Sequence, residues 1–142
     1  YMDELEQLAQ INKNVIFRPN VAFDELKTLY AQAHVYWHAA GYGIDEKVQP
    51  DLVEHVGISP LEAMASGCLT CCYKSGGPAR YITHGSNGLL YTSIDELVSQ
   101  TADILHDGAK QLEMMKNSQI YVGSHFSHPV FKNKVEQFFS LS

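Results

Sequence analysis

Residues 54–67, EHVGISPLEAMASG, are the most informative stretch of this 142-residue chain. The second half of the stretch predicts a helix, because Ser59 suits the N-cap position, Pro60 the first helical position and Glu62 the third. The first half is a short loop that contains Gly57. The stretch therefore predicts a sharp passage from loop into helix, with the free N–H groups of the helix start exposed.

Two carboxylates flank this helix start. Glu54 precedes the loop, and Glu62 follows after seven intervening residues, in the first turn of the helix. Unpaired N–H groups and the positive end of the helix dipole favour anions. Each carboxylate can also accept hydrogen bonds from sugar or ribose hydroxyls, worth about 1.5–3 kcal/mol each. The pattern indicates a site for an anion that carries hydroxyl groups, although Glu62 is also explained as a capping-box residue that serves only the helix.

Short apolar strands alternate with helical patterns on both sides of this stretch. We expect strands at 15–17, 34–38, 69–73 and 88–91, and helices at 3–11, 23–32, 59–66, 78–82, 93–107, 110–122 and 129–139. In the first helix Leu5 and Leu8 are expected to face inward, and the strand at 15–17 is expected to be buried. This alternation predicts an α/β fold, a Rossmann-like parallel sheet with helices on both faces.

Two loops follow expected strands and add to the candidate site. The long acidic loop 40–53 contains Gly41, Gly43 and Pro50, and the turn 75–78 reads SGGP. Parallel sheets bind ligands in the crevice at the carboxyl ends of their strands, so both loops should lie at that edge. Loops as long as 40–53 are usually functional or mobile.

The length and composition indicate a globular domain and argue against nucleic-acid-binding and membrane-spanning proteins. The chain has the length of one ordinary domain, and it is 45% hydrophobic and 18% charged, as a globular protein is. A formal net charge of −6, with scattered basic residues, argues against a nucleic-acid partner. No apolar run approaches the roughly 20 residues of a membrane span. The chain begins at Tyr1 without an initiator methionine or an upstream strand, so we expect a fragment of a longer protein.

Three cysteines, Cys68, Cys71 and Cys72, lie in one apolar strand. This is a poor disulfide framework, so we expect reduced thiols packed in the core and a cytoplasmic location. A redox or metal site is the alternative, but a thioredoxin-like pair would lie at a helix N-terminus. The histidines show no helical metal spacing with a carboxylate, so we expect no metal site.

Together these motifs resemble family-four retaining glycosyltransferases of the GT-B fold. The resemblance covers about residues 11–140 and rests on Glu54 and Glu62, followed by AMASG at 63–67, SGGP at 75–78, HGSNGLL at 84–90 and FS at 126–127. It implies that residues 1–142 form a single carboxyl-terminal, donor-binding domain, truncated at its N-terminal edge. The rest of the enzyme would include an N-terminal domain that binds the acceptor.

The resemblance also implies roles for individual residues. Glu54 would contact the donor sugar near the reacting carbon, and Glu62 would bind the ribose hydroxyls of the nucleotide. The backbone amides of Val56, Gly57 and Ile58 would hold the sugar and the diphosphate. Transfer in this family retains the anomeric configuration without an obligatory metal or other cofactor.

Four further positions are donor-site candidates. His38 ends a strand where the family has a polar residue beside the donor, although a lone histidine there can be purely structural. Gly76 and Gly77 form either an ordinary strand-to-helix turn or a loop that faces phosphate or sugar. Arg80 departs from the family, because many relatives have glutamate after this turn; an arginine could instead meet phosphate.

The expected function is the nucleotide-sugar-binding half of a retaining hexosyltransferase of mannosyl or glucosyl type. It would use a nucleoside-diphosphate sugar and a glycan or lipid-linked acceptor, with peripheral membrane association open for the full-length enzyme. The isolated chain should be inactive, because the acceptor domain and the basic loop that neutralises the leaving diphosphate lie outside it. The alternative is a non-catalytic nucleotide-sugar-binding module, which Arg80 favours. The choice between UDP and GDP stays open.

Overall fold

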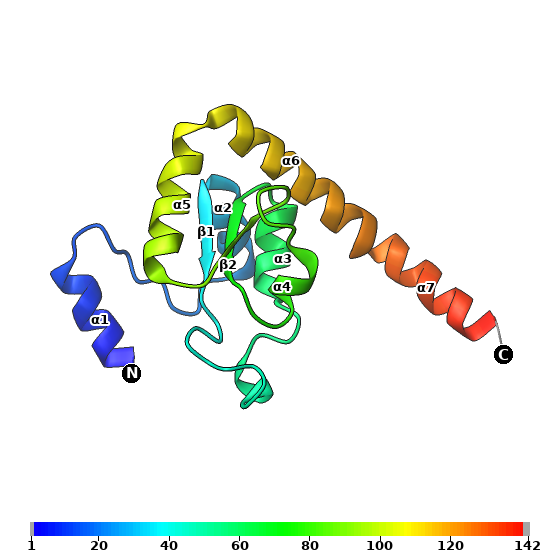
Figure 1. Ribbon diagram of the computed structural model, residues 1–142, viewed down its shortest axis with the longest axis horizontal. Coiled ribbons are helices and arrows are strands. Elements are labelled where there is room, and N and C mark those ends of the chain that lie inside the picture. The colour runs from blue at the N-terminus through cyan, green and yellow to red at the C-terminus, as the bar shows by residue number, and fades with distance from the viewer. Residues whose placement is uncertain (1, 141–142) are drawn as a thin grey trace.

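The computed structural model describes residues 2–140 of the chain. Helices alternate with short strands through its middle, as the sequence predicts. In chain order the elements are α1 (Met2–Ile11), α2 (Phe23–Gln32), β1 (Val35–His38), the 3-10 helix η1 (Pro50–Leu52), α3 (Ile58–Ala65), β2 (Leu69–Tyr73), α4 (Pro78–Tyr81), β3 (Leu89–Tyr91), α5 (Ile94–His106), α6 (Gly108–His125) and α7 (His128–Ser140). Figure 1 shows a central body from which α1 projects on one side and α7 on the other.

The three strands form one parallel sheet in the order β1-β2-β3. Trp37 of β1 lies beside Cys71 of β2, and Cys71 lies beside Leu89 of β3. Helix α3 connects β1 to β2, and α4 connects β2 to β3. The carboxyl ends of all three strands therefore meet at one edge. The loop 39–57 extends from that edge (Figure 1).

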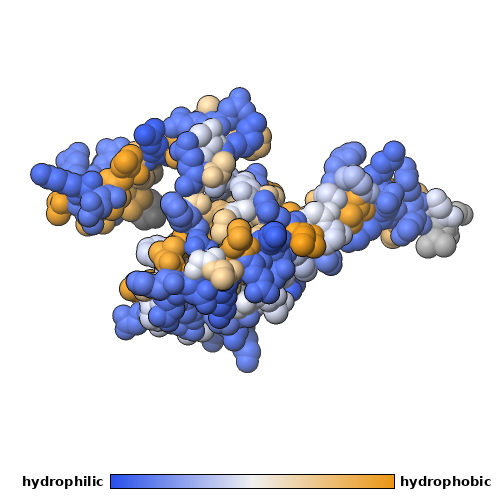
Figure 2. All heavy atoms as spheres, turned by 90° about the horizontal axis from the view of Figure 1, so that it is seen from above, coloured by the Kyte–Doolittle hydropathy of each residue, from blue (hydrophilic) through white to orange (hydrophobic). Residues whose placement is uncertain are grey.

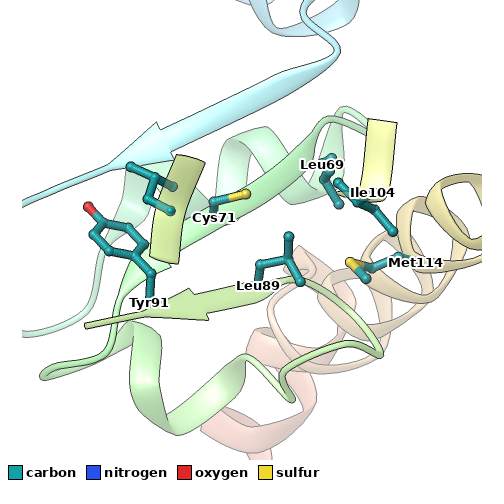
Figure 3. Close-up of a cluster of buried hydrophobic side chains, with 7 residues drawn as sticks. Leu69, Cys71, Leu89, Tyr91, Ile104 and Met114 are labelled. Carbon is teal, nitrogen blue, oxygen red and sulfur yellow. The ribbon is translucent and has the colours of Figure 1, made fainter. Parts of the chain in front are cut away.

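Successive side chains of β2 enter cores on opposite faces of the sheet, because side chains alternate along a strand. Leu69 and Cys71 point toward α5 and the first turns of α6 (Figure 3). The buried residues of this core are Leu69, Cys71, Leu89, Tyr91, Leu97, Ile104 and Met114.

Cys72 faces the other side of the sheet. It belongs to a buried cluster with Met64 of α3 and Tyr81 of α4. Tyr30 of α2 extends this layer by packing with Ala63 of α3. Helices thus cover both faces of a parallel sheet, which confirms the predicted α/β fold.

The strand predicted at residues 15–17 is wrong. This segment is irregular, and Val15 and Ile16 are 49% and 76% exposed. The physical reason is pairing: a strand needs a neighbour, and within residues 2–140 β1 hydrogen-bonds only to β2. The inward face predicted for the first helix is also wrong, because Leu5 is only partly buried and Leu8 is 62% exposed.

The start of α3 also differs from the prediction. Its N-cap is Gly57 rather than Ser59, and no side chain caps it. Gly57 has a left-handed φ of 80°, which turns the chain into the helix early. Ser59 is inside the helix, and its Oγ accepts a hydrogen bond from the Tyr36 hydroxyl at 2.9 Å. Glu62 therefore does not take part in the capping box that the local sequence predicted.

Side chains cap the start of the predicted helix α5. The Ser93 hydroxyl accepts a hydrogen bond from the Glu96 amide at 3.2 Å. The Glu96 carboxylate in turn accepts one from the Thr92 amide at 2.7 Å. The first bond satisfies an amide that the first turn of the helix leaves free, and the second ties the residue before the N-cap to that turn.

Apolar side chains are exposed on both projecting arms of the molecule, as Figure 2 shows. Ile11 on α1 is 81% exposed, and Phe131 and Phe138 on α7 are 65% and 75% exposed. None of the helices that residues 2–140 form has the length and apolar character needed to cross a bilayer.

Candidate functional site

The Glu54 side chain lies between two polar groups at the carboxyl edge of the sheet. Its Oε1 accepts a hydrogen bond from the Gly57 amide at 3.0 Å. Its Oε2 lies 3.6 Å from Nε2 of His38, the last residue of β1. The carboxylate is about one-third exposed, so it is oriented by the protein and still accessible.

His38 is a buried support for Glu54. The residue is 8% exposed, and its ring stacks on Tyr36 with centroids 6.3 Å apart. Its backbone carbonyl accepts a hydrogen bond from the Tyr91 hydroxyl at 2.9 Å. Burial lowers the pKa of His38, and the nearby Glu54 charge opposes this only in part. The imidazole is therefore neutral near pH 7 and meets Glu54 as a polar group rather than as a cation.

Gly57 fixes the passage from Glu54 into α3. A Cβ on this residue would lie 2.8 Å from the Tyr81 hydroxyl and 3.2 Å from Cγ of Glu54. The Tyr81 hydroxyl donates a hydrogen bond to the Gly57 carbonyl at 3.3 Å. Only glycine fits both the left-handed φ and the close packing. The helix then starts beside the carboxylate, where its first N–H groups have no acceptor within the helix.

Glu54 and Glu62 line one open depression on the surface. Its lining residues are Glu54, His55, Val56, Gly57, Ile58, Ser59 and Glu62. The structure thus brings together five of the residues that the sequence singles out. Val56 and Ile58 are 54% and 70% exposed, so apolar side chains border the depression.

Glu62 has a neighbour that the sequence did not reveal. It lines a small pocket together with Tyr30 of α2. Burial, together with the charges of Tyr36 and Glu62, raises the pKa of Tyr30 to about 12, so this hydroxyl keeps its proton. No sequence signal could have found Tyr30, because its position depends on how α2 packs against α3.

The glycine turn 75–77 lies behind this depression rather than in its lining. The Gly77 amide donates a hydrogen bond to the Glu54 carbonyl at 2.7 Å. A Cβ on Gly77 would lie 2.6 Å from two backbone oxygens, those of His55 and Val56, and a Cβ on Gly76 would overlap the Glu54 carbonyl. Both glycines are thus needed for close packing against the backbone of 54–56.

Arg80 does not line the depression. It is exposed on α4 and lies near Glu46, whose pKa it helps to lower. The larger causes of that lowered pKa are hydrogen bonds from the Gly76 amide and the Ser75 hydroxyl. Glu46 carries no sequence signal beyond its membership of an acidic loop.

The structure confirms the prediction that the three cysteines are packed in the core. Cys68, Cys71 and Cys72 are free thiols and at most 1% exposed. Burial raises the pKa of Cys68 to about 11 and that of Cys71 to about 12, and it raises that of Cys72 further. Such thiols are poor nucleophiles near neutral pH. Within the part of the chain that the structure describes, no three His, Cys, Asp or Glu side chains gather at a metal site.

Comparison with known sequences identifies a family. The family described as "Glycosyl transferases group 1" matches residues 1–120. The chain is 29% identical over 143 residues to the GDP-Man:Man(3)GlcNAc(2)-PP-Dol alpha-1,2-mannosyltransferase of Mus musculus, in a match that covers 92% of this chain and 26% of the mouse protein. It is 31% identical over 122 residues to the GDP-mannose-dependent alpha-(1-6)-phosphatidylinositol monomannoside mannosyltransferase of Mycobacterium tuberculosis, covering 80% and 30% of the two chains. The chain thus spans less than a third of these relatives.

Solved structures share the fold. HepE from Anabaena, crystallised with UDP, superimposes with a TM-score of 0.83 at 22% identity over 100% of this chain and 37% of HepE. The C-terminal domain of the group 1 glycosyl transferase LpcC from Francisella tularensis gives a TM-score of 0.70 at 22% identity, over 89% of this chain and 63% of that one. With the family match and the parallel sheet covered on both faces, the chain belongs to the group 1 glycosyl transferases and has the fold of the C-terminal, nucleotide-sugar-binding domain of GT-B enzymes.

Proposed function

We propose that this chain is the donor-binding half of a retaining mannosyltransferase that uses GDP-mannose and acts on a glycan or lipid-linked acceptor. The curated relatives described above are GDP-mannose-dependent by name, which favours GDP-mannose over UDP-glucose. An N-terminal domain outside this chain would bind the acceptor.

The observation that carries the proposal is the geometry around Glu54. The Glu54 carboxylate accepts a hydrogen bond from the Gly57 amide and lies 3.6 Å from His38. Glu54 and Glu62 line the same depression. In the proposal Glu54 contacts the mannose, and Glu62 contacts the ribose. The start of α3 between them faces the diphosphate, where its N–H groups and dipole stabilise the charge that develops as GDP departs. His38 positions Glu54.

Gly76, Gly77 and Arg80 have a different place in this proposal from the one that the sequence suggested. The two glycines hold the backbone of Glu54 from behind, because the Gly77 amide bonds to the Glu54 carbonyl. Arg80 lies near Glu46, and the proposal assigns it no donor contact. The proposal needs no metal at the diphosphate.

Titration of the 142-residue chain tests the binding half of the proposal. Amide chemical shifts are followed by NMR while GDP, GDP-mannose, UDP or UDP-glucose is added. We expect GDP-mannose to shift the amides of 56–58. Glu54→Gln should weaken GDP-mannose binding and leave GDP binding unchanged, whereas Glu62→Gln should weaken both. Asp51→Asn, an exposed acidic change in the neighbouring loop, is the control. Unmoved amides at 56–58 with every nucleotide would overturn the proposal.

Turnover in the full-length protein tests the catalytic half. Glu54→Gln should reduce mannosyl transfer far more than nucleotide affinity, since the contact is made to the reacting sugar. Donor binding without any transfer by the wild-type protein would instead support the non-catalytic module.

A further inference from the structure

The loop 39–49 is an ordered structure that lies across the carboxyl ends of the strands. Its turns are closed by backbone hydrogen bonds from Tyr42 to Ala39, from Ile44 to Gly41 and from Val48 to Asp45. The Tyr42 ring packs edge-on against Tyr73 at the end of β2, with centroids 5.1 Å apart. The first half of the loop therefore packs against the sheet through Tyr42.

Glu46 supplies a second anchor for this loop. Its Oε2 accepts hydrogen bonds from the Gly76 amide at 3.0 Å and from the Ser75 hydroxyl at 3.1 Å. These partners lie 30 and 29 residues away in the sequence, so the contact ties the loop to the turn after β2. A carboxylate on a backbone amide is a charge-assisted hydrogen bond, which is stronger than a neutral one.

The same turn carries the backbone of Glu54. Gly76 donates to Glu46, and the next residue, Gly77, donates to the Glu54 carbonyl at 2.7 Å. The glycine turn leaves no space on its other side, because a Cβ on Gly77 would lie 2.6 Å from backbone oxygens of 55 and 56. A shift of the turn toward 54–56 would therefore press on that segment, and a shift away from it would stretch the Gly77 hydrogen bond to Glu54.

We infer that Glu46 is a positioning residue that acts through the turn 75–77 to set the orientation of Glu54. This role deepens the proposed function and rests on it, because Glu54 matters as a donor contact only there. Without the Glu46 carboxylate, the Gly76 amide loses its acceptor and the turn loosens. The Gly77 bond to Glu54 then weakens, and the carboxylate of Glu54 spends less time in its place between Gly57 and His38.

Amide exchange in the 142-residue chain tests the physical link without any donor. In Glu46→Ala, exchange at Gly76 and at Gly77 should accelerate about tenfold or more, because a charge-assisted hydrogen bond is lost. Glu46→Gln keeps an acceptor and should give a smaller acceleration, as should Ser75→Ala, which removes one donor. The control Asp51→Asn removes the same charge from an exposed position nearby and should match wild type. An unchanged rate at Gly77 in Glu46→Ala would overturn the inference.

Turnover of the full-length enzyme tests the functional consequence. Glu46→Ala should lower kcat by about tenfold, with little change in KM for the donor, if it acts by misplacing Glu54. In a Glu54→Gln background the same change should give no further loss, because the residue it positions is already disabled. A full additional loss in that background would overturn the positioning role. If wild-type protein neither binds nor transfers a nucleotide sugar, the proposed function fails, while the exchange result still decides whether Glu46 holds the turn.

Discussion

His38 and Glu54 face each other at the carboxyl end of β1, with the imidazole Nε2 3.6 Å from the carboxylate Oε2. The histidine is buried and the carboxylate is partly exposed, so the pair links the core to the surface depression. The Tyr91 hydroxyl holds the His38 backbone, and the Gly57 amide holds the other Glu54 oxygen. The contacts of His38, Gly57 and Tyr91 each lead to a prediction that can be measured without an activity assay.

Protonation of His38 should oppose folding. Its pKa is lowered by burial in the folded chain, so below the unfolded value of about 6.5 the unfolded state binds a proton that the folded state does not. Stability should therefore fall as the pH drops through that value, by at most about 1.4 kcal/mol per pH unit. Urea unfolding at about pH 7.5 and about pH 5.5, on either side of that value, should show a smaller pH dependence in His38→Gln than in wild type. The exposed His128→Gln is the control, and an equal change in both variants would contradict the assignment.

Gly57→Ala should destabilise the chain for two separable reasons. The left-handed φ of 80° costs a residue with a Cβ about 1–2 kcal/mol, and contact with the Tyr81 hydroxyl adds to this. Gly43→Ala is the matched control, because Gly43 has a φ of 77° but an added Cβ there would meet no atom within 4 Å. Urea unfolding should rank Gly57→Ala as the more destabilised variant. Equal losses would show that the contact with Tyr81 contributes nothing.

Tyr91→Phe should cost about 1–3 kcal/mol, because it removes a buried hydrogen bond and leaves the His38 carbonyl without that donor. Tyr91 has no exposed surface, so water cannot replace the lost hydroxyl. Tyr42→Phe removes a hydroxyl from a residue that is 43% exposed and should leave stability near wild type. The two variants can be compared by their denaturant midpoints. An unchanged midpoint in Tyr91→Phe would show that the hydrogen bond from Tyr91 to the His38 carbonyl does not stabilise β1.

The three thiols should react only when the chain unfolds. Each is buried with a raised pKa, so at about pH 8 the native protein should not react with a thiol reagent on the time scale of free cysteine. In denaturant all three should react at once. Colorimetric thiol counting measures both states. Rapid native reaction of even one thiol would revive a redox role for this strand.

Much of the fold could be predicted from the sequence, because it depends on local patterns. The apolar run at 69–73 and the helical spacing at 23–32 indicated elements that the structure confirms. The cap at Ser93 is local too, because its partners lie within one turn of each other. By contrast, 15–17 has a strand-like composition but no strand beside it, and composition cannot supply a pairing partner.

Local patterns in the sequence were enough to predict most of the alternation of strands and helices, the burial of the cysteine strand, and the spacing of Glu54 and Glu62. These follow from periodicity and from chemistry within a few residues. The packing of the folded chain places Gly57 rather than Ser59 at the N-cap of α3, and the Tyr36 hydroxyl donates a hydrogen bond to Ser59 across 23 residues. The same packing brings Glu46 to the glycine turn across 30 residues. Contacts of this kind depend on which surfaces pack together, because a hydrogen bond requires two groups to be brought within about 3 Å by the whole fold.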